Sequence, residues 1–378
     1  MSGNPSGLVA GDHERDLADA LRSLAADLLP PSALRACLDS GTGHPAQAWK
    51  AMTTELGLCG LMVPESYGGL GLGWAEVNTV HVELGRTLFP VPFLVTSLAT
   101  TAILVADDVR AAERWLPGIA NGSSTATIAW PVGRRDRVTA TRDEHGWSLA
   151  GQYEHVMAAQ IAQVLLLFAA TQAGLSLFAL DLADPGVTVE QLPGLDLTRR
   201  TCRVRFEDAR AVAVGEIGTG QEALDQVGRH LRLALAAEAV GGLSWCVDTC
   251  VEHSRTREQF GRPIGSFQAV AHACVEMFAA LQTARAGARW AACAQDAEDP
   301  EAELAGHVVA LRTGIAYRDQ TEAAIHLLGG IGFTWEHDAH LYYRRARASL
   351  ALGGGPTAHQ LAIAELAGLP ASIDSGLV

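Results

Sequence analysis

A single glutamate, Glu238, stands in the otherwise apolar stretch Leu235–Gly242. Burying an ionised carboxylate is costly unless it is paired. An acid in this position is therefore either half of a buried ion pair, for which Arg232 or Arg257 could supply the cation, or a group kept for proton transfer. We favour the ion pair and keep catalysis as the alternative.

Two histidines three residues apart, His337 and His340, flank Asp338. His337 and Asp338 could act as an acid–base pair, or the spacing of His337 and His340 could suit a metal ion. The simpler interpretation is a helix start, with Thr334 as the N-cap and acidic residues in the first turn. We therefore predict a helix over Glu336–Leu350 and no metal site.

Four groups of short motifs follow one another along the chain. They are Leu56–Leu58 with Val63–Gly69, Glu83–Arg86, Arg257–Ile264 with Phe267–Gln268, and Gly329–Thr334 with Arg344–Arg347. Each is weak alone, but together and in this order they are specific. On these residues the chain resembles the acyl-CoA dehydrogenase family, and within it the actinobacterial heteromeric subunits of the steroid-side-chain type.

The resemblance implies an α+β fold with three domains. These are an N-terminal helical domain (1–122), a middle β-barrel-like domain (123–218) and a C-terminal four-helix bundle (219–378). It also implies a homo- or hetero-tetramer, FAD at a subunit interface, an acyl-CoA substrate, and electron-transfer flavoprotein as the electron acceptor.

The same resemblance assigns a set of cofactor contacts. Arg257 would reach the FAD pyrophosphate of a neighbouring subunit, a task that suits a forked guanidinium, and Phe260 would pack near the cofactor. His326 stands where the family has a glutamine, and it can still donate a hydrogen bond. Gly329 and Gly330 would let the backbone approach the cofactor. The alternative is that these residues only end helices and form turns.

The part that cradles a subunit's own flavin departs from the family. Its acidic and small residues correspond to 129–136, where Arg134 and Arg135 stand instead. These arginines are either solvated charges or ligands for a CoA phosphate. The family's aromatic and threonine contacts to the flavin ring correspond to His155 and Met157.

The residues at the family's catalytic-base positions also differ from the family pattern. The implied reaction removes an α-proton from an acyl thioester, which needs a carboxylate in a dry site. The usual family position falls on Gly353 and a rarer one on Leu231, and neither is acidic. Glu238 lies two turns beyond Leu231 on the same helical face, so it is the candidate base. Arg232 matches a family arginine that lines the acyl-CoA site.

Hydrophobic spacing indicates which elements position these residues. Helical spacing predominates over residues 12–114, with a break at Pro30–Pro31 and a glycine-rich loop before Trp74. The predicted strands are Thr125–Trp130, Val138–Arg142, Trp147–Leu149, Val164–Thr171, Ser176–Leu182, Val187–Leu192 and Cys202–Phe206. The later predicted helices are one from Gly220, Ser266–Gln295, Ala302–Leu328 and Glu336–Leu350.

Composition limits the classes of partner. The 378 residues carry a net charge of −14, with 48% hydrophobic and 19% charged residues. Such an acidic chain is a poor ligand for nucleic acids or anionic membranes. The N-terminus is polar and no apolar run reaches 18 residues, so we expect a cytoplasmic protein without a membrane span. The seven cysteines form no C-x-x-C pair, which favours buried free thiols.

Three functions remain open. The chain is a dehydrogenase subunit that shares its flavin site with an unlike partner, because the residues that reach a neighbour's flavin persist while the others have changed. Alternatively, it is a self-sufficient homo-oligomer whose base has moved, for example to Glu238. The third possibility is a non-catalytic structural subunit with the same fold.

Overall fold

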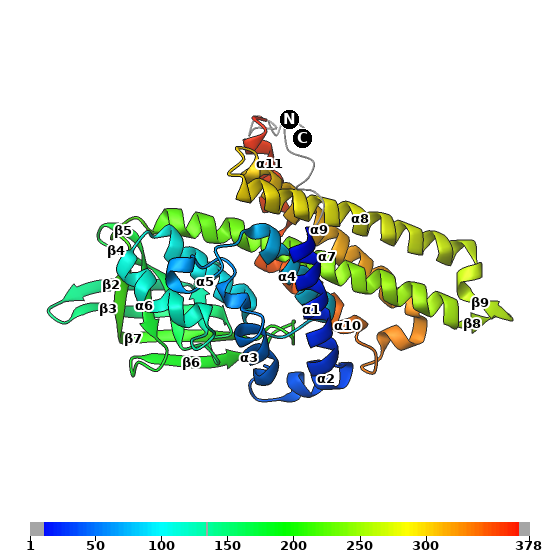
Figure 1. Cartoon of the computed structure of the whole chain (residues 1–378), viewed down its shortest axis with the longest axis horizontal. Coiled ribbons are helices and arrows are strands. Elements are labelled where there is room, and N and C mark those ends of the chain that lie inside the picture. Colours follow the sequence, from blue (N-terminus) through cyan, green and yellow to red (C-terminus); the bar gives the residue numbers. More distant parts are fainter. Residues whose placement is uncertain (1–10, 134, 370–378) are drawn as a thin grey trace, which may run out of the picture. The chain divides into compact units, whose positions relative to one another are not determined.

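The computed structural model describes residues 11–133 and 135–369 (Figure 1). The α-helices are α1 (Asp12–Leu28), α2 (Pro31–Asp39), α3 (Ala46–Thr54), α4 (Trp74–Thr87), α5 (Phe93–Val105), α6 (Val109–Ala120), α7 (Gly220–Thr256), α8 (Gln268–Asp296), α9 (Ala302–Leu328), α10 (Ala339–Leu352) and α11 (Gly355–Leu366). The strands are β1 (Ala126–Ala129), β2 (Arg137–Asp143), β3 (Gly146–Met157), β4 (Val164–Thr171), β5 (Gly174–Asp181), β6 (Val187–Leu192), β7 (Thr201–Val214), β8 (Glu258–Gln259) and β9 (Arg262–Pro263). This mixture of helices with a central sheet confirms the predicted α+β class.

Packing divides the chain into two compact units. The barrel unit contains Leu24–Gly73 and Pro90–Leu231, and the helical unit contains Trp74–Phe89 with the described parts of Met1–Ser23 and Arg232–Val378. Each unit is built from segments far apart in the sequence. The three-domain boundaries at 122/123 and 218/219 stay a prediction.

In the barrel unit, the strands close on themselves. The sheet order is β1-β4-β2-β3-β7-β5, and β5 also pairs with β4, so the strands from β4 through β5 form a ring, with β6 added beside β7. Closure leaves the strands of the ring without free edges. Alternate residues of β2 and β7 are buried, and they fill an interior that includes Leu149, Leu167 and Phe178.

Helices of the same unit are joined to the barrel through polar side chains. Thr96 of α5 donates its hydroxyl to the Ala126 carbonyl of β1 (2.9 Å). Asp108 caps α6 by accepting from the Arg110 and Ala111 amides (3.0 and 3.2 Å) and also accepts from the Gly215 amide (3.1 Å). One N-cap carboxylate thus fixes both the start of a helix and the end of β7.

In the helical unit, small residues let helices approach closely. A Cβ atom at Gly241 of α7 would lie 2.0 Å from the Val82 carbonyl oxygen of α4, and one at Gly85 would lie 2.1 Å from that of Glu238. The start of α4 is capped from a distance, because Asp296 accepts from the amides of Trp74 and Ala75 (2.6 and 3.0 Å). α4 is therefore fixed to α7 along its face and to α8 at its first turn.

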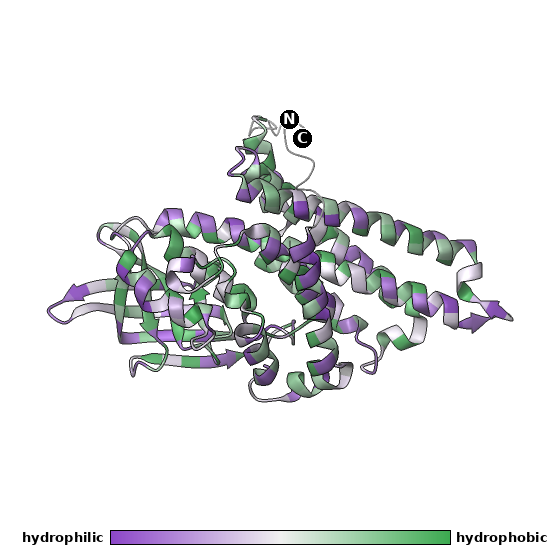
Figure 2. Cartoon of the chain, viewed as in Figure 1, coloured by the Kyte–Doolittle hydropathy of each residue, from purple (hydrophilic) through white to green (hydrophobic). Residues whose placement is uncertain are grey.

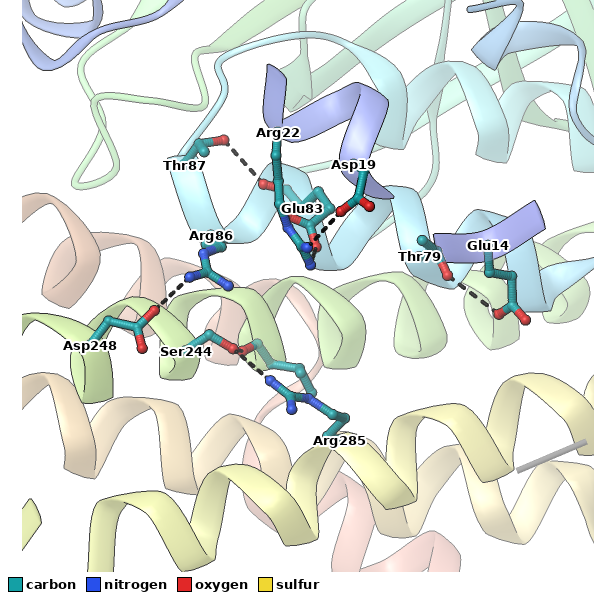
Figure 3. Close-up of polar contacts among 11 residues, drawn as sticks. Glu14, Asp19, Arg22, Thr79, Glu83, Arg86, Thr87, Ser244, Asp248 and Arg285 are labelled. Carbon is teal, nitrogen blue, oxygen red and sulfur yellow. Dashed lines mark hydrogen bonds and ion pairs between the residues drawn. The ribbon is translucent and has the colours of Figure 1, made fainter. Parts of the chain in front are cut away.

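Charged contacts link the helices of this unit further (Figure 3). Arg22 of α1 donates to Glu83 of α4 (2.6 Å), and Arg86 of α4 donates to Asp248 of α7 (2.6 Å). Glu14 of α1 pairs with Arg289 of α8. Burial opposes ionisation of Glu14, but hydrogen bonds from Arg289 and the Gly11 amide outweigh it and lower the pKa of the Glu14 carboxyl.

Several predicted elements need correction at their ends. β4, β6 and α9 have the predicted bounds, whereas β3 and β7 are much longer than expected. The helix predicted from Glu336 begins at Ala339, and Thr334 does not cap it, because its hydroxyl donates to the Ile331 carbonyl (2.9 Å). Helix α11 was not predicted.

Among residues 11–133 and 135–369, α7 is the one helix that is long and apolar enough to span a membrane. However, 78% of its most apolar segment is buried within the protein. It is therefore a core helix. The cysteines are free thiols, of which five are buried and two are intermediate.

Candidate functional site

One set of predicted cofactor residues lies where α7 ends. Arg257 follows the last residue of α7, and its backbone is held by bonds to His253 (2.9 Å) and Ile264 (2.8 Å). Its guanidinium is exposed and pairs with no carboxylate among the described residues. Burial and the nearby Arg257 charge lower the pKa of His253. An exposed guanidinium carried by a backbone that is held in place can bind an external phosphate.

Phe260 occupies the turn of the β8–β9 hairpin, a hydrophilic projection of the helical unit (Figure 2). Its side chain is 91% exposed, and its backbone has a φ of +55°, next to Gly261 at +75°. Positive φ is unfavourable for an aromatic residue. An exposed aromatic ring in a strained turn suggests a site that another molecule covers.

The second predicted set lies at the end of α9. His326 is in the last turn and is exposed, as are Gly329 and Gly330. Gly329 has φ +65° and ψ −139°, and no atom lies within 4 Å of a Cβ built on either glycine. No hydrogen bond or ion pair between described residues joins this set to Arg257 or Phe260. The residues of both sets are exposed on the surface of the helical unit.

The predicted contacts to the subunit's own flavin lie in the barrel unit. Met157 is buried, 4% exposed, and His155 is exposed at a β3 bulge with a φ of +59°. Arg134 lies outside the described residues. The Asp136 carboxylate accepts from the Val132 and Gly133 amides of its own loop and from the Glu154 amide of β3. The Met157 side chain carries no hydroxyl, and its carbonyl accepts from the Thr127 hydroxyl (2.6 Å).

Glu238 is buried, 6% exposed, and paired. One carboxylate oxygen lies 3.3 Å from the Arg345 Nη1, and the other lies 3.7 Å from the Nδ1 of His81. The expectation that Arg232 or Arg257 is the partner is wrong, because α10 places Arg345 there instead. Glu238 thus connects α4, α7 and α10, which is the arrangement of a structural carboxylate.

A small cavity lies inside the helical bundle. It measures about 20 Å³ and opens among four helices, which is room for roughly one water molecule. Its lining residues are Arg232, Leu235, Ala236, Ala239, Ala310, Thr313, Gly314, Tyr317, Ala346, Ser349, Leu350, Gly353 and His359. Arg232 and Gly353, which the family resemblance places at an acyl-CoA site, therefore line one cavity.

The polar side of this cavity is a chain of ionisable groups that the sequence analysis did not identify. Arg232 pairs with Glu303. The same Glu303 lies 3.2 Å from the Nε2 of His307, whose Nδ1 lies 3.0 Å from the Nδ1 of His359. His359 is on the missed helix α11. Pro356 at its second position, directly after three glycines, was the available signal for a helix start.

Relatives were found by sequence and by structure. Residues 11–123 match the acyl-CoA dehydrogenase N-terminal domain and residues 218–367 match the C-terminal domain. The chain is 31% identical to acyl-CoA dehydrogenase IpdE2 of Mycobacterium tuberculosis over 90% of its own length and 92% of the relative's.

Solved structures agree with the sequence relatives. A chain of the ChsE4-ChsE5 complex from Mycobacterium tuberculosis superposes with a TM-score of 0.87 at 27% identity, covering 96% of this chain and 100% of that one. A variant of the Tcur3481-Tcur3483 steroid ACAD superposes with a TM-score of 0.84 at 28% identity, covering 95% and 98%. Both structures are named as pairs of proteins.

Proposed function

Because the chain belongs to the acyl-CoA dehydrogenase family, a family of flavin-dependent oxidoreductases, we propose that it serves as one subunit of a heteromeric enzyme. The enzyme introduces a double bond between Cα and Cβ of an acyl-CoA thioester, and its flavin is FAD. When bound, the flavin accepts the hydride from Cβ. We further propose that the enzyme works in the cytoplasm and passes electrons to electron-transfer flavoprotein.

The observation that carries the proposal is an asymmetry. The residues that would serve a neighbour's flavin (Arg257, Phe260, His326, Gly329 and Gly330) are exposed. Their chemistry fits a dinucleotide, since it combines an external guanidinium, an aromatic ring and two glycines with open space before them. In contrast, Met157 is buried where the family has a hydroxyl, so this chain is poorly suited to hold a flavin in its own barrel unit.

Within such an enzyme, this chain would bind and orient rather than react through Glu238. Arg257 would neutralise pyrophosphate charge, and Phe260 would cover an apolar part of the cofactor. The named pairs among the structural relatives support an unlike partner subunit. The steroid relative supports a bulky acyl group, such as a sterol side chain, on the thioester.

The visible absorption spectrum tests the proposal directly. The chain is purified alone and after co-expression with candidate dehydrogenase subunits, and bound FAD is counted per chain. We expect flavin only in the co-purified complex, and Arg257→Gln should weaken FAD retention by at least about tenfold, the loss of one charge-assisted contact. Arg255→Gln, which changes an exposed arginine two residues away, is the matched control. One FAD per chain and full turnover without a partner would refute the proposal.

A purely structural subunit is the second candidate, because neither Gly353 nor Leu231 supplies a carboxylate. It differs in one measurable respect. Arg257→Gln would then leave FAD retention of the complex unchanged and alter only its assembly. A self-sufficient homo-oligomer that uses Glu238 would instead lose all turnover, but no flavin, on Glu238→Gln.

A further inference from the structure

The sequence contains a single lysine. Of its 28 lysine and arginine residues, only Lys50 is a lysine. The two side chains differ in chemistry, because the amine of a lysine can act as a nucleophile, whereas the guanidinium of an arginine stays protonated. Apart from the α-amino group at the N-terminus, Lys50 therefore carries the only primary amine of the chain.

Helix α3 holds this lysine in a defined position. Its buried face contains Ala48, Trp49 and Met52, and the Trp49 Nε1 donates to the Thr125 hydroxyl (3.1 Å), directly before β1. Lys50 is exposed. The backbone that carries the amine is thus anchored to the barrel unit, while the amine itself is accessible to other molecules.

A cavity of about 420 Å³ opens beside Lys50, between the end of α1 and α3. Its volume falls within the ~300–1,000 Å³ that is usual for small-molecule sites. Its lining residues, all in the barrel unit, are Leu24, Asp27, Leu28, Gln47, Lys50, Ala51, Thr54 and Glu55. Leu24 and Leu28 are half-buried and Ala51 is buried, and these three form an apolar floor. The other five are exposed and form a polar rim. This arrangement suits a molecule with an apolar chain and a polar end.

The charged side chains of the rim are available to such a molecule. Among residues 11–133 and 135–369, the side chains of Lys50, Asp27 and Glu55 form no ion pair and no hydrogen bond. Lys50 contributes its backbone carbonyl instead, which accepts from the Thr54 hydroxyl (2.8 Å). The ε-amine of Lys50 is therefore not engaged within the described part of the chain.

We propose that Lys50 is an N-acylation site, whose ε-amine takes the acyl group of an acyl-CoA thioester with a long apolar chain. The unprotonated amine attacks the thioester carbonyl carbon. The N–C bond forms as the C–S bond breaks, and coenzyme A leaves as a thiol with the proton that the nitrogen releases. The inference takes its co-reactant from the proposed function, which brings acyl-CoA thioesters to this chain, but the reaction needs neither the flavin nor a partner subunit.

The cavity favours this reaction over that of an ordinary exposed lysine. An acyl chain on the apolar floor holds the thioester beside the amine, which makes the attack effectively unimolecular. Each methylene that is removed from water strengthens this binding. Gln47 lies one turn before Lys50 on the same face of α3, where its amide can donate to the carbonyl oxygen as that oxygen gains negative charge. Acylation then replaces the cation of the rim with a neutral amide.

Intact-mass spectrometry of the purified full chain tests the proposal. The chain is incubated with octanoyl-CoA or acetyl-CoA between pH 7 and pH 9, and then with hydroxylamine, which removes acyl groups from cysteine thiols but not from amines. We expect one octanoyl amide, mapped to Lys50 by proteolysis. It should form at least about tenfold faster than in a synthetic peptide of residues 44–56, a modest part of what positioning can supply. Acetyl-CoA should show no such advantage. Equal octanoylation rates in chain and peptide would overturn the proposal.

Three variants locate the reaction. Lys50→Arg keeps the charge but removes the amine, so the amide at position 50 should disappear. Leu28→Asn, which makes the apolar floor polar, should slow octanoylation at least about fivefold and leave acetylation unchanged, because less of the chain is then held out of water. Val109→Asn, which changes an exposed apolar side chain elsewhere in the barrel unit (60%), should change neither rate. Octanoylation that is as fast in Leu28→Asn as in wild type would overturn the role of the cavity.

Further measurements keep the result decisive. Thermal unfolding shows whether Leu28→Asn remains folded, and Leu24→Asn replaces it if it does not. The outcomes also separate this proposal from that of the shared flavin site. A chain that forms the octanoyl amide but retains no FAD with any partner supports the acylation site and refutes the shared flavin site. A complex that retains FAD while its Lys50 reacts no faster than the peptide does the reverse.

Discussion

Gly242 of α7 lies against the ring of Tyr317 of α9, so closely that a Cβ atom at 242 would be 2.2 Å from the Tyr317 Cζ. Tyr317 is 2% exposed and cannot swing into solvent. We predict that Gly242→Ala lowers the free energy of unfolding by about 1–3 kcal/mol, the cost of overpacking a filled core. Urea titration of the chain measures it. Gly41→Ala, where no atom lies within 4 Å, should change stability by less than about 0.5 kcal/mol.

Breaking the buried ion pair of Glu238 and Arg345 should greatly lower the free energy of unfolding. Arg345→Met should destabilise the chain by about 3–5 kcal/mol, because it leaves Glu238 buried without its guanidinium. The double variant with Glu238→Gln should recover part of that loss. A double-mutant cycle in thermal or urea unfolding checks this, and simple additivity of the two single changes would contradict the pairing.

The ionised carboxylate of Glu14 should stabilise the folded chain at neutral pH but not in acid. Its pKa is lowered in the folded chain, so the unfolded state binds more protons in the acid range. The stabilisation is therefore complete above the unfolded pKa of roughly 4.5 and is lost as the pH falls through the lower folded pKa. The difference in free energy of unfolding between wild type and Glu14→Gln should become smaller as the pH falls from 7 to 3. A difference that does not change with pH would show that the charge of Glu14 does not cause the stabilisation.

Because Phe260 is exposed, replacing it should affect subunit assembly but not the stability of the isolated chain. Replacing it with Asn, which tolerates positive φ, should leave the melting temperature of the isolated chain unchanged or slightly higher. The same change should weaken subunit association and FAD retention. Light scattering and absorbance of the co-purified complex measure both. Val132→Ser, which changes another exposed apolar side chain (64%), should alter neither.

The sequence was sufficient for elements with a uniform pattern. The bounds of β4 and β6 came from short apolar or alternating runs, and those of α9 from helical spacing between loops. β3 and β7 were underestimated because each is interrupted. β3 includes Gly151 at a φ of +125°, two residues after the predicted end, and β7 includes Asp208 at a φ of +55°. An interruption of this kind resembles a strand end in sequence but only bends a strand in the sheet.

Partners across the fold were not predictable in the same way. Glu238 was recognised as an acid that needs a cation, but Arg345 lies 107 residues away along the chain. His307 and His359 are 52 residues apart, and neither belongs to a recognised motif. The motifs named the residues that would face a neighbour's cofactor. Their exposure, which supports that role, required the packed structure.

The carboxylate of Asp296 closes the first turn of α4 from 222 residues further along the chain. During synthesis, the amides of Trp74 and Ala75 leave the ribosome long before their acceptor exists. The helical unit, which draws on the beginning, middle and end of the sequence, is therefore assembled last. The barrel unit, whose final strand is complete at Val214, is available to fold while the bundle is still being made. A chain cut short before residue 296 would lose the cap of a helix that begins at Trp74.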